Sequence, residues 1–189
     1  MQNPWDVRST PLAGDAAPEA IYLQVGHALT AWEAGESALG ELFDALVASQ
    51  PSNRAAFSAF TAVSSSSART QLVEAAFKRA MRDDDPAYED TARLIYQFSK
   101  FGARRNELAH GRVFSLGEHG FMLGPNNTNP NKWKNGSATY QYTSADIAYY
   151  ATQFAEQAIE IQRLASALVA RNIAAVANKS RKNRRGRTA

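Results

Sequence analysis

Apolar residues recur every three or four positions along most of the chain, which is the spacing of amphipathic helices. The pattern predicts helices over Glu19–Ser49, Asn53–Val63, Arg69–Arg82 and Pro86–Ala109, and a long last helix that begins at Thr143 or Ser144. The expected core stripe of the first helix is Ile21, Val25, Ala28, Trp32, Leu39, Leu42 and Leu46. That of the third is Leu72, Val73, Ala76, Phe77 and Ala80. That of the last is Ile147, Ala151, Phe154, Ala158, Ile161, Ala165 and Leu168, a seven-residue repeat suited to close helix packing.

Proline, glycine and capping residues mark where these helices begin and end. Pro51 is expected to end the first helix, and the run Ser64–Ser67 is expected to be a linker that also supplies an N-cap. Asp83–Pro86 favours a helix start, because acids suit the positive end of a helix and proline fits its first turn. A catalytic acid cluster is the less favoured interpretation of these acids. Gly111 is expected to end the fourth helix in a left-handed conformation.

The helical period is interrupted before the last helix. Arg112–Leu116 and Gly120–Leu123 have the pattern of two short strands around a turn at Gly117–His119, and Gly124–Gly136 is an Asn-rich loop. Ser137–Tyr142 is expected to add a third short strand. The predicted fold is therefore all-α. It is an antiparallel bundle of four to five helices with a small β-hairpin or three-strand excursion before the last helix.

Length and composition limit the classes of protein that fit. The 189 residues suffice for one domain, expected over residues 19–172, after a flexible leader at residues 1–18 that has three prolines. The chain has no cysteine, which excludes disulfides, thiolate metal sites and cysteine nucleophiles. With three histidines only, we expect no metal and no cofactor. No signal peptide or run of about 20 apolar residues is present, so we expect a cytoplasmic protein without a membrane partner.

The charge is unevenly distributed. Seven of the 21 Lys and Arg residues lie between Arg171 and Ala189, where there is no acid, so residues 1–170 carry a net charge of −4. We expect residues 173–189 to be a disordered basic tail. Such a tail is typical of non-specific contact with nucleic acid, although a tail that only aids solubility is an equal alternative.

The strongest candidate for chemistry is the end of the fourth predicted helix, because phosphate-binding, zinc-protease and serine-hydrolase motifs are all absent. Its sequence is Phe101-Gly102-Ala103-Arg104-Arg105-Asn106-Glu107-Leu108-Ala109-His110-Gly111. Extending the apolar stripe from Gly102 or Phe101 predicts Arg105 on the inward face, where an arginine is costly unless it is paired. Arg105 and His110 are about 140° apart on a continuous helix, so they meet only if the helix loosens or across a partner chain.

This segment resembles the R-x(4–6)-H motif of the HEPN superfamily, in which a polar residue often follows the arginine, here Asn106. Arg104 also satisfies the motif with one more spacer residue. The resemblance implies a small helical bundle acting as a metal-independent ribonuclease, often a toxin or phage-defence effector. It implies a homodimer with a composite site, and an antitoxin or another protein partner. It also implies cleavage of RNA by its own 2′-hydroxyl, leaving 2′,3′-cyclic phosphate ends.

In that interpretation each motif residue has a chemical role. Histidine side chains exchange protons near neutral pH, so His110 would act as base or acid, Arg105 would stabilise charge on the phosphate, and Asn106 would orient one of them. The substrate-binding candidates are Arg104, Lys100, Lys132, Trp133 and Lys134.

The alternatives assign the same residues to structure. One alternative is a non-catalytic module of this fold, which binds a partner protein, RNA or a nucleotide and uses Arg105 to stabilise the fold. The other is a plain helical assembly protein in which the motif is coincidental.

Overall fold

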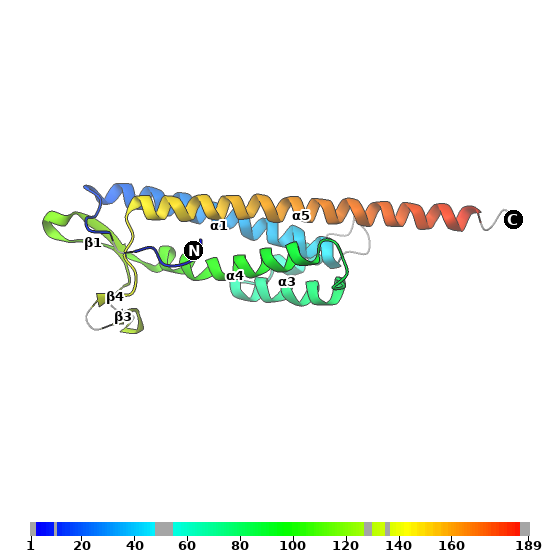
Figure 1. The fold of residues 1–189 in the computed structure, drawn as a ribbon, viewed down its shortest axis with the longest axis horizontal. Helices are drawn as coiled ribbons and strands as arrows, with labels where there is room; N and C mark the ends of the chain where they lie inside the picture. The colour runs from blue at the N-terminus through cyan, green and yellow to red at the C-terminus, as the bar shows by residue number, and fades with distance from the viewer. Residues whose placement is uncertain (1–2, 10, 48–54, 127–129, 135–136, 186–189) are drawn as a thin grey trace. The chain divides into compact units, whose positions relative to one another are not determined.

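The computed structural model describes residues 3–9, 11–47, 55–126, 130–134 and 137–185 (Figure 1). The described chain is predominantly α-helical, which confirms the predicted fold class. Its helices are α1 (Pro18–Val47), α2 (Ala55–Thr61), α3 (Ser66–Ala80), α4 (Tyr88–His110) and α5 (Ser144–Arg185). Its strands are β1 (Arg112–Ser115), β2 (Phe121–Gly124), β3 (Trp133–Lys134) and β4 (Ser137–Ala138). The predicted stop at Pro51 and start at Asn53 lie outside the described residues.

The chain divides into two compact units, each built from two separate stretches of sequence. Unit 1 comprises Met1–Gly35 and Tyr96–Ala158, and unit 2 comprises Glu36–Ile95 and Ile159–Ala189. The helices α1, α4 and α5 each contribute residues to both units.

The core of unit 1 is aromatic. Trp32 stacks on Phe98 with ring centroids 4.3 Å apart, and Phe154 meets Trp32 edge-on at 5.2 Å. Phe101, three residues after Phe98 on α4, meets Phe154 edge-on as well. Gly35 leaves room for this packing, since a Cβ atom there would lie 2.9 Å from the Phe98 ring. Ring pairs of this geometry add to the stabilisation that burial of their apolar area provides.

In unit 2, the helices are fixed by a cap and by buried apolar residues. Ser65 is the N-cap of α3 and accepts a hydrogen bond from the Ala68 N–H, which confirms the predicted cap. The expected stripe of α3 is only partly correct. Val73, Ala76 and Phe77 are buried, but Ala80 is exposed because it lies in the last turn of the helix.

The start of α5 is a reciprocal cap. The Asp146 N–H donates to Thr143 Oγ1, while the Thr143 N–H and hydroxyl donate to the Asp146 carboxylate. The backbone N–H groups of Thr143 and Asp146 thereby each have an acceptor. The predicted stripe of α5 is confirmed, because every member is buried except Ala151, which is half-buried.

The expected hairpin is present in unit 1. The strands β1 and β2 pair antiparallel in the register Arg112↔Gly124 to Ser115↔Phe121, with a 3₁₀ turn at Gly117–His119 between them. The third predicted strand, Ser137–Tyr142, is confirmed only in part. Only Ser137–Ala138 forms a strand, and it pairs with β3. Tyr142, at the end of the predicted strand, forms an isolated β-bridge to the hairpin at Leu123.

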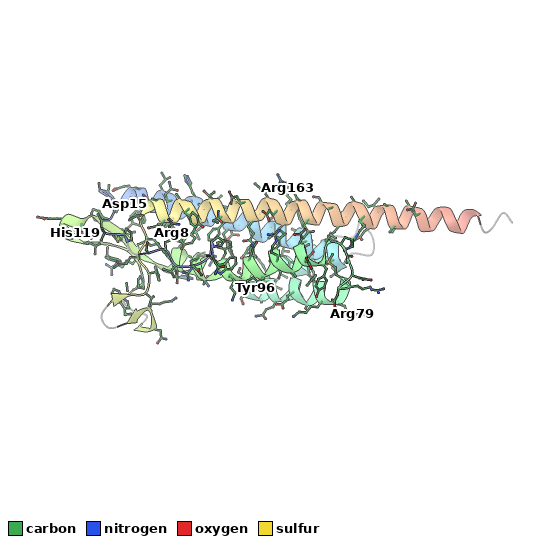
Figure 2. The ribbon with its side chains drawn as sticks, in the orientation of Figure 1. Arg8, Asp15, Arg79, Tyr96, His119 and Arg163 are labelled. Atoms are coloured by element: carbon green, nitrogen blue, oxygen red, sulfur yellow. The ribbon has the colours of Figure 1, made fainter. Side chains whose placement is uncertain are left out.

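The segment before α1 makes contacts that its composition did not predict. Asp15 forms a β-bridge with Phe121, and its carboxylate accepts hydrogen bonds from the Ser144 N–H and hydroxyl. Arg8 pairs with Asp146 at 2.8 Å, and Figure 2 shows Arg8 and Asp15 near the start of α5. Gly14 allows the close approach, because a Cβ atom there would lie 2.3 Å from the Phe121 carbonyl oxygen. The leader was expected to be flexible, but these contacts attach its described residues to β2 and to the start of α5.

At the other end, the helix α5 continues to Arg185, through most of the segment expected to be a disordered basic tail. Residues 186–189 lie outside the described part. No helix in the described ranges combines the length and apolar character needed to cross a bilayer.

Candidate functional site

The last two turns of α4 line a pocket in unit 1. Ala103, Asn106, Glu107 and His110 have the i, i+3, i+4, i+7 spacing of one helix face, and all four line it. The pocket has a volume of about 450 Å³, within the usual range of small-molecule sites. Its opposite wall comes from the segment after the hairpin and consists of Pro125, Asn126, Lys132 and Tyr140. Asn106 and His110 are exposed, so the pocket has both within reach of a ligand.

A buried carboxylate organises this pocket. Glu107 is only 5% exposed, and its Oε1 accepts from Arg104 at 3.1 Å and from Lys132 at 3.2 Å. Its Oε2 accepts from the Tyr142 hydroxyl at 2.7 Å. The hydroxyl of Tyr140 donates to the backbone carbonyl of Glu107 at 3.4 Å. One glutamate thus joins α4 to the Lys132 segment and to the residues just before α5.

Burial beside this carboxylate raises the pKa of two tyrosines, Tyr140 and Tyr142. Desolvation, together with the negative charge of Glu107, raises the pKa of Tyr140 to about 12. The same causes raise the pKa of Tyr142 even further, and Arg104 offsets only part of the effect. Both hydroxyls are therefore donors at neutral pH, and neither is available as a base.

These shifts predict alkaline sensitivity. A tyrosine in the unfolded chain ionises near pH 10, whereas Tyr140 does so at about 12 and Tyr142 above that. Between pH 10 and 12 the folded protein therefore binds more protons than the unfolded chain. The contribution of these tyrosines to the free energy of unfolding is fully present below pH 10 and falls as the pH rises from 10 to 12. A spectrophotometric titration should show phenolate absorbance from these two rings only together with unfolding. The Tyr140→Phe variant should lose less stability over that interval, and an equal loss would contradict the assignment.

The structure places the two adjacent arginines differently from the prediction. Arg104 is the inward one. It is 9% exposed, pairs with Glu107 and donates to the Tyr142 hydroxyl at 3.4 Å. Arg105, predicted to point inward, is half-buried and donates to Asn106 Oδ1 at 3.3 Å. The buried face of α4 runs from Phe101 through Arg104 to Leu108, and Glu107 and Tyr142 accept hydrogen bonds from two nitrogens of the Arg104 guanidinium.

Arg105 and His110 do not come together within one chain. The helix α4 is continuous up to His110, so the two residues lie about 140° apart around its axis. The loosening that would let them converge is absent. Gly111 ends the helix without the left-handed conformation expected of it, since only Gly117 and Gly120 have positive φ among the described glycines. Gly111 is needed for space instead, because a Cβ atom there would lie 2.9 Å from Leu123 Cγ.

The remaining candidates are scattered. Lys132 lines the pocket, while Trp133 is half-buried with a buried Nε1 that has no hydrogen-bond partner among the described residues. Lys100 is exposed on α4, with its ammonium group 5.0 Å from the centre of the Tyr96 ring. The side chain of Lys134 lies outside what the structure describes. His27 and His119 are both exposed, and His119 lies at the turn of the hairpin, where Figure 2 labels it.

Sequence reasoning missed the central role of Glu107. Its three-residue spacing from Arg104 was a signal for an ion pair on one helix face. Its other partners, Lys132 and Tyr142, lie 25 and 35 residues further on and gave no local signal.

No group of three or more histidine, aspartate or glutamate residues suited to a metal ion occurs among the described residues. No protein-family model matches this sequence, and no curated protein or solved structure gives a significant match. Any functional conclusion therefore depends on the residues of the site itself.

Proposed function

We propose that this protein is a metal-independent RNA endonuclease of the HEPN type. The observation that carries the proposal is the connected set of motif residues at the open pocket. His110 and Asn106 line it, and Arg105 is hydrogen-bonded to Asn106 at its edge. A cytoplasmic toxin or phage-defence effector, controlled by an antitoxin or another protein, is the role that the motif suggests.

The chemistry needs only the groups of this motif. The ribose 2′-oxygen attacks the neighbouring phosphorus while its proton passes to a base, and the bond from phosphorus to the 5′-oxygen breaks as that oxygen gains a proton. An exposed imidazole such as His110 performs either proton transfer. A guanidinium donates forked hydrogen bonds to the phosphate oxygens as their charge grows, which is the role of Arg105. The products are a 2′,3′-cyclic phosphate and a free 5′-hydroxyl.

The separation of Arg105 from His110 has a consequence for this mechanism. Since one continuous helix holds them on different sides, a complete site needs residues from two copies of the chain. We therefore propose a homodimer in which Arg105 of one copy serves His110 of the other. Mixing inactive Arg105→Ala and His110→Ala proteins should then restore cleavage.

The deciding experiment is an RNA-cleavage assay in excess EDTA. We expect the wild type to cleave single-stranded RNA, to leave 2′,3′-cyclic phosphate ends, and to spare an oligonucleotide with 2′-deoxyribose at the cleaved position. Cleavage of the deoxy-substituted strand, or a requirement for added metal, would refute the mechanism. Absence of cleavage for several RNA classes by a pure dimer would refute the proposal.

A second candidate, a non-catalytic binding module of the same fold, is favoured by that same separation of Arg105 and His110. In that case the pocket would hold a ligand without reacting with it. A protein that binds RNA or a partner through the pocket but cleaves no RNA would support this candidate.

A further inference from the structure

The charges around the pocket do not cancel. Glu107 is the only acid that lines it in the described part of the chain, and it pairs with two cations, Arg104 and Lys132. One carboxylate neutralises one of these two charges, so the cluster keeps one net positive charge before His110 is counted. The pocket therefore favours an anion.

The lysine is fixed in position at both ends. The Lys132 carbonyl oxygen accepts a hydrogen bond from the Thr139 N–H at 2.9 Å, and the ammonium group donates to Glu107. An ammonium group has three N–H donors, and the bond to Glu107 uses one of them. Because the Lys132 side chain is 41% exposed, an incoming group can reach the others.

The other lining groups add donors. The Asn106 Oδ1 accepts a hydrogen bond from Arg105, and the amide N–H donors of Asn106 lie on the opposite side of that amide group from Oδ1. His110 adds an imidazole N–H on the same helix face as Asn106. The one carboxylate that lines the pocket in the described part of the chain is not available as a ligand for a metal cation, because Glu107 Oε1 already accepts from two cations.

We propose that this pocket is an anion-binding subsite in which Lys132 contacts a backbone phosphate of single-stranded RNA next to the phosphate that is cleaved. The inference rests on the proposed nuclease function, and it adds a contact from outside the Arg105–His110 motif. Glu107 acts only by orienting the lysine.

Two measurements test the subsite. Inorganic phosphate, titrated while the His110 imidazole signals are followed by NMR, should bind the wild type and bind Lys132→Met about tenfold more weakly. The affinity for a single-stranded oligonucleotide should depend less steeply on salt in Lys132→Met, with the slope of log K against log salt smaller by about 0.7. The matched control is Lys78→Met, which removes an exposed lysine of α3 that pairs with Glu74 and should change neither result.

The outcomes separate the subsite from the nuclease. If Lys132→Met binds phosphate as tightly as the wild type, or if its salt slope is unchanged, the subsite is refuted even when RNA is cleaved. If phosphate binding depends on Lys132 but the wild type cleaves no RNA, the anion site is supported and the nuclease is refuted.

Discussion

The His110→Ala variant is expected to cleave RNA at least about 100-fold more slowly than the wild type, because a positioned general acid or base contributes about 10²- to 10⁴-fold. His110 is exposed at the last position of α4, so its removal should leave folding intact. The measurement is the initial rate on a single-stranded RNA in EDTA, with circular dichroism as the check on folding.

The matched control is His119→Ala. Like His110, His119 is an exposed histidine at the last position of a helical element. That element is the 3₁₀ turn of the hairpin, and His119 does not line the pocket. This variant should retain the wild-type rate. Equal rates for the wild type and both variants would remove His110 from the mechanism and indicate a contaminating nuclease.

The Arg104→Ala variant is expected to lose about 3 kcal/mol or more of unfolding free energy, whereas Arg105→Ala should lose less than about 1 kcal/mol. Removal of Arg104 takes one of the two cations from the buried Glu107 and a donor from Tyr142. Among the described residues, the side-chain bond that Arg105→Ala removes is the one to the neighbouring Asn106. Urea unfolding followed by circular dichroism measures both values.

The Arg104→Lys variant keeps the charge and should recover part of the lost stability, although its single ammonium nitrogen lacks the planar fork with which the guanidinium reaches Glu107 and Tyr142 from two separate nitrogens. If Arg105→Ala proved the more damaging of the two alanine variants, Arg105 would be the structural arginine. That result would favour the non-catalytic module over the nuclease.

The comparison of α5 with α4 shows which parts of the fold could be predicted from the sequence. In α5 the apolar positions repeat without interruption, so the period alone determined the buried face. In α4 two arginines are adjacent and lie about 100° apart, and the stripe could be extended through either one. A partner 38 residues away decided the matter, because the Tyr142 hydroxyl accepts from Arg104 and donates to Glu107.

The candidate site shows the same limit. Asn106 and His110 are four residues apart, a spacing that puts them on one face of α4, and both line the pocket. The opposite wall could not be predicted, since Lys132 lies in the Asn-rich loop, which has no periodicity, and Tyr140 lies in the short segment that follows it. Its place is determined by single contacts, namely those of Lys132 and Tyr140 with Glu107. Such contacts leave no pattern in a sequence.

The division into two discontinuous units also constrains the order of folding during synthesis. Unit 1 needs Tyr96–Ala158 to join Met1–Gly35, so the part of α1 up to Gly35 must wait on the ribosome for partners more than 60 residues behind it. Trp32 has neither Phe98 nor Phe154 to pack against until those residues emerge. The nascent chain therefore exposes apolar surface for most of its translation, a state in which aggregation and chaperone binding compete with folding.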